Sequence, residues 1–262
     1  MCNMTCHLYK FECLSSLHVG SGEANYNIID NEVERDPITG NPVVHASGLK
    51  GALRKHFEKT MDAKDINRIF GNPTTADQVG AGTYKFFDAK ILSRPMRVAG
   101  TLPCVSVTDL SILEAYLKMR ADFGLVSPGV QSLPAINFDD NEFMTNAPAA
   151  EISAVEDEKT GRLTENMDCI KNILGTDKFA LAKKFNAYPL PVVAHNKLEN
   201  GISKQLWYEE YVPAGSVFIF LMITPTDTVE LPKVELPLES ELIQIGANAS
   251  IGYGFIKITK LA

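Results

Sequence analysis

The feature that most constrains the fold is an unbroken apolar run, VFIFLMI, at Val217–Ile223. A strand with one face in water alternates apolar and polar residues, so this run predicts a strand that is buried on both faces. The run is the longest of its kind in the chain, and it is far shorter than the roughly 20 apolar residues that span a bilayer. We therefore expect an internal strand of a covered sheet and no transmembrane helix.

Strands and helices are mixed along the rest of the chain. Strands are predicted at about 5–14, at 83–92 and, as a strand–loop–strand unit, at 242–245 and 255–258. The strongest helical pattern has Ser47 as its N-cap, and further helices are predicted from Ser111 to about Phe123 and over 166–185 with a break at Gly175. Unequal insertions separate these elements, which favours an α+β fold over a doubly wound sheet.

The length of 262 residues fits one enlarged domain, 1–262, with a large insertion. The insertion covers about 124–162, where Pro, Asn, Asp and Ala are frequent and periodicity is weak, and we predict a flexible arm there. A second polar stretch, 25–42, ends in the turn signal Thr39-Gly40-Asn41-Pro42. Loops of that length inside a compact domain usually carry function.

The charge balance limits the kind of partner. A formal net charge of −7 argues against a surface that is basic all round, but it allows a local basic groove, because affinity for phosphate depends on where the cations lie. The first residues, MCNMTCHLYKFEC, lack the charged and apolar regions of a signal peptide. We therefore expect a soluble, cytoplasmic protein with no membrane partner.

Two glycine-rich stretches are candidates for close approach to a phosphate or to another backbone. His18-Val19-Gly20-Ser21-Gly22 follows the first predicted strand, and Gly246–Phe255 lies between the last two. Glycines permit such an approach because they have no Cβ. The structural alternatives are a simple turn for the first stretch and a bulged hairpin for the second.

Two charged stretches complete the set of candidates. The loop after the first strand carries Asp30, Glu32, Glu34, Arg35 and Asp36, which could bind a divalent metal next to RNA or form a solvated acidic loop. The helix start Ser47–Arg54 combines free backbone amides with two cations, and an anion bound there would explain Lys50 in the first turn. A solvated helix face is the alternative for this second stretch.

In this order the four stretches resemble the RAMP proteins of CRISPR systems, in particular the repeated backbone subunit of the type III-B (Cmr) effector complex. The shared pattern is a His-x-Gly-Ser-Gly loop, an Asp-bearing loop ending in Arg-x-x-x-Thr-Gly-x-Pro, a Ser-x-Leu-Lys-Gly-x-Leu-Arg helix start and a late Gly-x-Asn-x-x-x-Gly-x-Gly-Phe loop. Because these motifs touch both ends and the middle, the resemblance covers most of the chain.

The resemblance implies an RRM-like ferredoxin fold, the RAMP palm, with insertions that form a thumb. It implies a role in antiviral defence, in which copies of the chain stack along a CRISPR RNA guide together with other Cmr-complex subunits. Target single-stranded RNA pairs with the guide, and each copy cuts it once, at regular intervals. Base pairing then supplies the sequence recognition, so that the protein need only bind the RNA backbone through a narrow basic strip.

The resemblance also assigns residues. It implies catalysis at Asp30, with a divalent metal ion, Mg²⁺ or Mn²⁺, bound by the same carboxylate, and Glu209 and Glu210 are candidates for a second carboxylate by composition only. Lys50 and Arg54 match positions that hold the guide backbone. The remaining predicted RNA-binding residues are His18, Gly20, Ser21, Arg35, Ser47, Gly246, Asn248 and Gly252.

Three alternatives stay open. Departures from the family pattern at Glu32, Gly48 and Ala247 allow a scaffold that binds guide RNA without cutting the target. The chain could instead belong to the related type III-A (Csm) complex. The third alternative is an enzyme of another class, whose glycine loops bind a nucleotide or another phosphate-bearing small molecule.

Overall fold

The computed structural model describes residues 4–20, 22, 28–72, 80–97, 104–125, 133–147, 160–163, 167–226 and 236–262. Within these residues the helices are α1 (Ala46–Phe57), α2 (Ala63–Phe70), α3 (Leu110–Asp122) and α4 (Asp168–Leu174), with short 3-10 turns at Phe185–Ala187 and Ala249–Ile251. The strands are β1 (Met4–Cys13), β2 (Val43–Val44), β3 (Lys85–Phe86), β4 (Ala89–Arg97), β5 (Cys104–Thr108), β6 (Phe143–Thr145), β7 (Thr160–Arg162), β8 (Phe179–Ala182), β9 (Val192–Glu199), β10 (Ile202–Glu210), β11 (Val217–Pro225), β12 (Leu242–Gln244) and β13 (Phe255–Lys260). The predicted site residue Ser21 lies outside the described residues.

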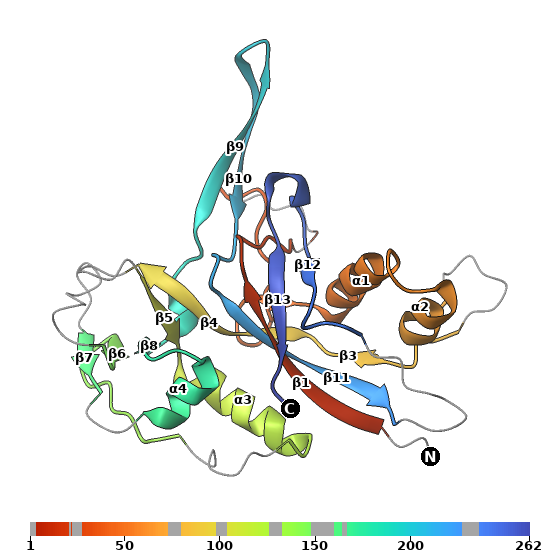
Figure 1. Cartoon of the computed structure of the whole chain (residues 1–262). Helices are drawn as coiled ribbons and strands as arrows, with labels where there is room; N and C mark the ends of the chain where they lie inside the picture. The colour runs from red at the N-terminus through yellow and green to blue at the C-terminus, as the bar shows by residue number, and fades with distance from the viewer. Residues whose placement is uncertain are drawn as a thin grey trace.

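Four antiparallel neighbours, in the order β13-β1-β11-β4, organise the main sheet (Figure 1). β1 and β4 are therefore parallel to each other with β11 between them, and α1 lies in the connection from β1 to β4. This is the split βαβ arrangement of the ferredoxin fold. The predicted α+β class is confirmed.

The central position of β11 explains its unbroken apolar sequence. It pairs with β1 on one side and with β4 on the other, and its residues from Val217 to Met222 are buried. Phe218 stacks on Phe11 with ring centroids 5.0 Å apart, and Phe220 stacks on Tyr9 at 5.4 Å. A strand with both edges paired and both faces covered has no position for a charged side chain, so the prediction from the apolar run is confirmed.

The helix that carries the candidate anion site begins two residues earlier than predicted, since its N-cap is residue 45 instead of 47. Ser47 is not the N-cap, because α1 starts at Ala46 and His45 occupies the N-cap position without a capping side-chain bond. The Ala46 N–H instead donates to Asp88 Oδ1 at 2.7 Å, so a carboxylate from the β3–β4 connection caps the helix. A charged acceptor from a distant segment satisfies this amide better than a local hydroxyl would, and sequence periodicity does not reveal it.

Two further predicted helices differ from the structure. The N-cap of α3 is Asp109, whose Oδ1 accepts the Ile112 N–H, and Ser111 only adds a second bond to the same oxygen. The predicted helix over 166–185 ends at Leu174, because Gly175 adopts the left-handed conformation that stops helices. Phe179–Ala182 then forms strand β8, which pairs with β5 and β6.

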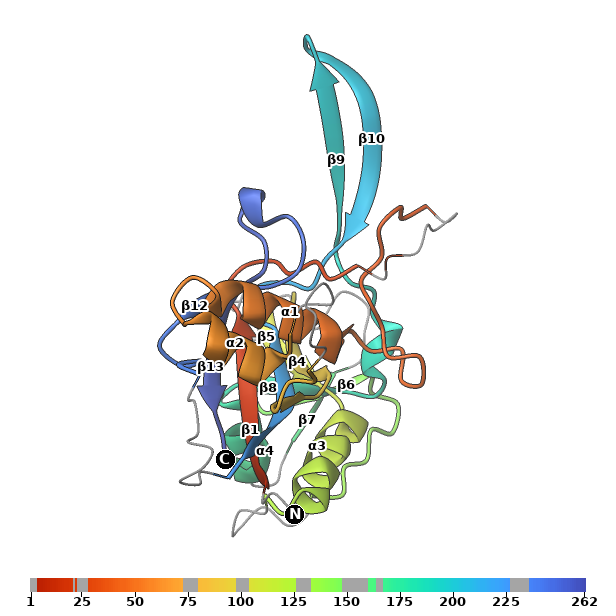
Figure 2. The same cartoon turned by 90° about the vertical axis from the view of Figure 1, so that its right-hand side faces the viewer.

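The element that projects from the body is the β9–β10 hairpin, which the sequence analysis did not predict (Figures 1 and 2). The sequence predicted a flexible arm at 124–162 instead. In the described part of that insertion, however, β6 and β7 join the main sheet. Residues 126–132 and 148–159 of that insertion lie outside the described residues. In the described ranges no helix is long and apolar enough to cross a membrane.

Cysteine labelling provides a direct check on this fold. Cys13 is buried in β1, and burial raises the pKa of its thiol to about 12, whereas Cys104 is exposed at the start of β5. Only the thiolate reacts with a maleimide, so native protein at pH 8 should label quickly at Cys104 and stay unlabelled at Cys13 until denaturant is added. Equal labelling of the two residues in peptide mass spectra of native protein would contradict the placement of β1.

Candidate functional site

Two of the predicted stretches, the first and the last glycine-rich loops, lie against each other. The Ala247 N–H donates to the His18 carbonyl at 2.9 Å, and the Gly254 N–H donates to the Ser16 carbonyl at 2.8 Å. Gly246 has φ +74°, and a Cβ added there would overlap the His18 carbonyl oxygen. The close backbone approach that these glycines predicted is therefore an approach of one loop to the other.

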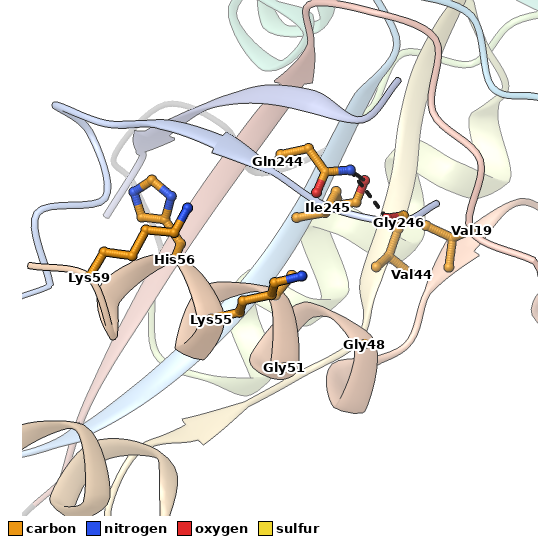
Figure 3. A pocket seen from close by; sticks show the side chains of 11 residues that line it. Val19, Val44, Gly48, Gly51, Lys55, His56, Lys59, Gln244, Ile245 and Gly246 are labelled. Carbon is orange, nitrogen blue, oxygen red and sulfur yellow. Dashed lines mark hydrogen bonds between the residues drawn. The ribbon is translucent and has the colours of Figure 1, made fainter. Parts of the chain in front are cut away.

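A cavity of about 330 Å³ lies between this loop pair and α1 (Figure 3). Lys55 and His56 line it from the helix, Lys59 lines it from the turn that follows, and Gln244, Ile245 and Gly246 line it from the opposite side. Gly48 and Gly51 complete the helical wall, and no atom lies within 4 Å of a Cβ added at either position. The cavity thus combines bare helical backbone with cations, which is the chemistry that a phosphate chain requires.

The two lysines of the cavity are available to a ligand. Lys55 and Lys59 are exposed, and neither ammonium group has a hydrogen bond or ion pair to any described residue. His56 is held differently, since its Nε2 lies 3.5 Å from Glu241 Oε2. The free positive charge in this cavity therefore comes from the two lysines.

The two cations predicted from the resemblance occupy different environments. Lys50 is half-buried, has no partner among the described residues and does not line the cavity. Arg54 uses its donors inside the fold: it binds Glu58 Oε1 at 2.7 Å, the Gly71 carbonyl at 2.6 Å and Asn67 Oδ1 at 3.0 Å. Arg54 ties α1 to α2, and its binding to RNA stays a prediction, as does that of the exposed Ser47.

A buried carboxylate joins four segments at the root of the hairpin. Glu209 on β10 is 4% exposed; its Oε1 accepts the Asn248 amide and its Oε2 accepts the Asn31 amide at 3.4 Å. His18 Nδ1 and His195 Nε2 lie 3.9 and 3.7 Å from Oε1. His18 Nδ1 donates to the Glu210 carbonyl at 2.7 Å, because a carbonyl can only accept. Glu209 therefore connects the predicted site residues His18 and Asn248 to the loop that follows β1.

Both oxygens of the neighbouring carboxylate, Glu210, also accept hydrogen bonds inside the fold. Glu210 is also 4% exposed; its Oε1 accepts from Arg35 at 2.5 Å and its Oε2 accepts the Val33 N–H at 3.1 Å. The Arg35 guanidinium further donates to the Gly40 carbonyl at 3.2 Å, so this predicted RNA-binding residue holds its own loop against the hairpin. Buried pairs of this kind fix geometry, since either partner left alone would be an uncompensated charge.

Asp30 lies beside the same hairpin and is exposed. Its Oδ2 accepts the Tyr208 N–H at 2.8 Å, and its own N–H donates to the Tyr208 carbonyl at 3.1 Å. Asn31, the next residue, donates to Glu209. Within the described part of the chain Asp30 Oδ1 has no partner, so one carboxylate oxygen is anchored and the other is free to accept a hydrogen bond.

The described residues do not form a ready-made metal site. They contain no group of three His, Cys, Asp or Glu side chains with the spacing of metal ligands. Glu209 and Glu210, the candidates for a second carboxylate, point into hydrogen bonds with Asn248 and Arg35. A divalent ion at Asp30 would thus have one protein carboxylate, and we derive no chemical step through a metal.

Aromatic side chains lie close to the buried Glu209 carboxylate. Trp207 on β10 stacks on His195 of β9 with centroids 5.3 Å apart, on the side of the hairpin where Glu209 lies. Burial, and after it the charge of Glu209, raises the pKa of the nearby Tyr253 hydroxyl. Tyr253 thus stays protonated at neutral pH and can donate a hydrogen bond.

The spacing of the sequence relates the two cavity lysines to the glycines of α1. Gly48, Gly51 and Lys55 are spaced at three and four residues, which places them on one face of α1, and Lys59 follows at the same spacing in the turn after the helix. The buried residues Leu49, Leu53 and Phe57 occupy another face of the helix. The glycine face of α1 therefore continues to Lys55 and, just after the helix, to Lys59, while RNA binding by Lys50 and Arg54 stays a prediction.

Comparison with known proteins decides the family. The RAMP superfamily matches this chain over residues 10–257, nearly its whole length. The chain belongs to the RAMP superfamily. The RRM-like palm expected from the resemblance agrees with this membership and with the sheet order described above.

Individual relatives of this RAMP chain agree with the assignment. It is 26% identical to the CRISPR system Cmr endoribonuclease Cmr4 of Pyrococcus furiosus, over 98% of this chain and 96% of the relative. The CRISPR system Cms endoribonuclease Csm3 of Streptococcus thermophilus is 40% identical over a shorter match, which covers 22% of this chain and 32% of that protein.

Solved structures show the same fold. A chain of the type III-B Cmr-beta complex bound to cognate target RNA superposes with a TM-score of 0.75 at 19% identity, covering 98% of this chain and 97% of that one. Oligomeric Cmr4 from Pyrococcus furiosus gives a TM-score of 0.68 at 20% identity, with 98% of both chains covered. The fold that the motif order implied is thereby confirmed.

Proposed function

We propose that this chain is a backbone subunit of an RNA-guided type III-B CRISPR effector complex, in which it binds the guide RNA and cleaves the paired target RNA. The observation that carries the proposal is the link between two places in the fold. The cavity with the free lysines is walled by the 245–254 loop, and Asn248 of that loop is connected through Glu209 to Asn31, the residue next to Asp30. A bound RNA backbone and an exposed carboxylate are therefore held in one rigid frame.

The proposed chemistry uses the 2′-hydroxyl of the target RNA. Asp30 accepts the proton of this hydroxyl, the 2′ oxygen attacks the adjacent phosphorus, and the bond from phosphorus to the 5′ oxygen breaks. The departing 5′ oxygen takes a proton from solvent water, and Asp30 later returns its proton to the solvent. The products are a 2′,3′-cyclic phosphate and a 5′-hydroxyl end. Asp30 suits this role because Tyr208 fixes one of its oxygens and leaves the other open.

The requirement for Mg²⁺ or Mn²⁺ is part of the proposal. Asp30 would supply the single protein carboxylate, and RNA and water oxygens would have to complete the shell. Metal dependence is tested by adding a chelator to the assembled complex and restoring each ion separately. Cleavage that continues unchanged in the chelator would leave Asp30 as an acid–base group without a metal.

The overall function is tested by assembling the chain with guide RNA and the other Cmr-complex subunits and mapping the target ends. The proposal predicts cuts at regular intervals, one for each copy of the chain. A complex that binds target RNA but leaves it whole would favour the scaffold alternative. The type III-B assignment is favoured over type III-A because the Cmr4 relative aligns with 98% of this chain and the Csm3 relative with 22%.

Removing the two free lysines should weaken RNA binding through charge alone. Lys55→Ala together with Lys59→Ala is expected to lower affinity for guides of every sequence and to reduce the slope of log affinity against log salt by roughly 0.7 for each lysine. Lys118→Ala on α3, where the lysine pairs with Asp122, is the matched control. Binding curves measured from low to high salt that keep the wild-type slope would contradict a phosphate role for this pair.

A further inference from the structure

The side chain of Gln244 makes a set of contacts that the function proposed above does not use. Its Nε2 lies 3.0 Å from the Ile245 carbonyl, 3.2 Å from the Gly246 carbonyl and 3.3 Å from the Tyr253 carbonyl. Ile245 and Gly246 begin the loop between β12 and β13, and Tyr253 is near its end. One amide group therefore bridges both limbs of the loop, and Figure 3 shows it on the rim of the cavity.

The loop depends on this bridge because its backbone supplies little else across the two limbs. Among the described residues, two backbone bonds link the limbs: the Ile245 N–H donates to the Gly254 carbonyl at 2.9 Å, and the Tyr253 N–H donates to the Asn248 carbonyl at 3.2 Å. The bonds further along the loop are local turn bonds, and Gly246, Asn248, Gly252 and Gly254 all have positive φ. A loop with so few crossing bonds is held in one shape only if its side chains add more.

The chemistry at this position requires a donor. Carbonyl oxygens only accept, so three of them converging on one point need N–H groups between them. The strand places Gln244 correctly, since its neighbours Ile243 and Ile245 are buried and Gln244 is half-buried on the other face of β12. A carboxylate of the same size would repel the three oxygens, and a thioether would leave them unsatisfied.

The loop between β12 and β13 contacts two parts of the proposed site, the cavity and the hairpin root. Gly246 is part of the cavity wall opposite Lys55, and Asn248 donates to Glu209 at the hairpin root. We infer that Gln244 is a positioning residue that sets the width of the RNA-binding cavity and the register of Asn248 on Glu209. This inference rests on the proposed function, since it names the group that shapes the same site.

Three substitutions at one position test the inference. Gln244→Met keeps the length and removes the donor, Gln244→Glu replaces the donor by an acceptor, and Gln244→Lys restores donors. Hydrogen exchange of the loop should be about five- to tenfold faster in the Met and Glu variants and near wild type in the Lys variant. The informative amides are those of Ala247 and Gly254, which bond to the His18 and Ser16 carbonyls.

RNA affinity supplies the second measurement. The Met variant is expected to bind RNA about five- to tenfold more weakly at every salt concentration, with an unchanged salt slope because no charge is lost. A general loss of stability would instead lower the melting temperature and speed exchange throughout the chain. Gln205→Met on the exposed part of β10 is the control for the exchange measurement.

Two results would overturn the inference. One is wild-type exchange of the loop amides in the Met and Glu variants, and the other is faster loop exchange together with wild-type RNA affinity. If the wild-type chain binds no RNA at all, the proposed function fails, whereas the exchange data still decide whether Gln244 holds the loop.

Discussion

Replacing Asp30 by asparagine is expected to slow target cleavage by roughly 10²- to 10⁴-fold, the range for removal of a general acid–base group. The substitution is well matched to the site, because the asparagine oxygen can still accept the Tyr208 N–H that anchors Asp30. The negative charge and the basic oxygen are lost, while the loop keeps its attachment to β10. Affinity for guide and target RNA should therefore stay within about twofold of wild type, since an exposed side chain away from the lysine-lined cavity changes.

The measurement is the rate of cutting by the assembled complex under single-turnover conditions. Asp122→Asn, an exposed change on α3, is the control for loss of a carboxylate elsewhere. Cleavage at the wild-type rate in the Asp30 variant would remove Asp30 from the mechanism. A parallel loss of RNA binding would show that Asp30 acts in assembly instead of in the chemical step.

Replacing Gly254 by alanine is expected to destabilise the chain by about 3–5 kcal/mol, which is at the upper end for one substitution. Gly254 is buried with φ +79°, and an added Cβ would overlap the Ile245 carbonyl oxygen, which belongs to the backbone and cannot rotate away. Gly252→Ala is the matched control in the same loop, since Gly252 has φ +87° and nothing lies within 4 Å of an added Cβ. The Gly252→Ala substitution should lower the free energy of unfolding only by the backbone strain of about 1–2 kcal/mol.

Denaturant unfolding of the two variants separates the steric overlap, which is expected only at position 254, from the backbone strain, which is expected at both positions. The account predicts a clear difference between them, together with weaker RNA binding for the Gly254 variant, because the displaced loop carries the cavity wall. Equal stability of the two variants would mean that the loop relaxes without cost, and the tight packing of the loop against Ile245 would then be wrong.

Much of the fold could be predicted because local patterns and packing agree. The apolar run at 217–223 has a single physical solution in a chain of this size, a strand covered on both faces, and β11 is that strand. The apolar face of α1, at Leu49, Leu53 and Phe57, is buried as its periodicity indicates. Errors arose where a distant group decides the local structure, as with the Asp88 cap on α1.

The β9–β10 hairpin escaped prediction for a related reason. Most of its residues are exposed, so burial does not impose the alternation that marks a half-buried strand. What holds it is its root, where Glu210 pairs with Arg35 and where Arg94 donates to the Tyr188 and Pro189 carbonyls at 2.6 and 3.1 Å. Burial lowers the pKa of Arg94 to about 10, which still leaves it charged at neutral pH.

Sequence motifs do not determine the contacts that the predicted site residues make, and the RNA-binding roles of these residues stay predictions. The motifs indicated two glycine-rich loops, and the structure adds that the late loop, with Gly246 and Asn248, bonds to the first one. Arg35 and Arg54 were predicted to bind RNA, but their donors are engaged with Glu210, Glu58 and Asn67. A sequence motif does not indicate whether a guanidinium faces a ligand or its own fold, because that depends on contacts made far along the chain.

The central claim, that RNA runs through the cavity between α1 and the 245–254 loop, is tested most directly by photo-crosslinking. Guide RNA with 4-thiouridine at successive positions would be assembled into the complex, irradiated, and the crosslinked peptides identified by mass spectrometry. The account predicts crosslinks in the peptides that contain Lys55, Lys59 and the loop after Gln244. Crosslinks confined to peptides of α3 and α4, with none from these segments, would contradict it.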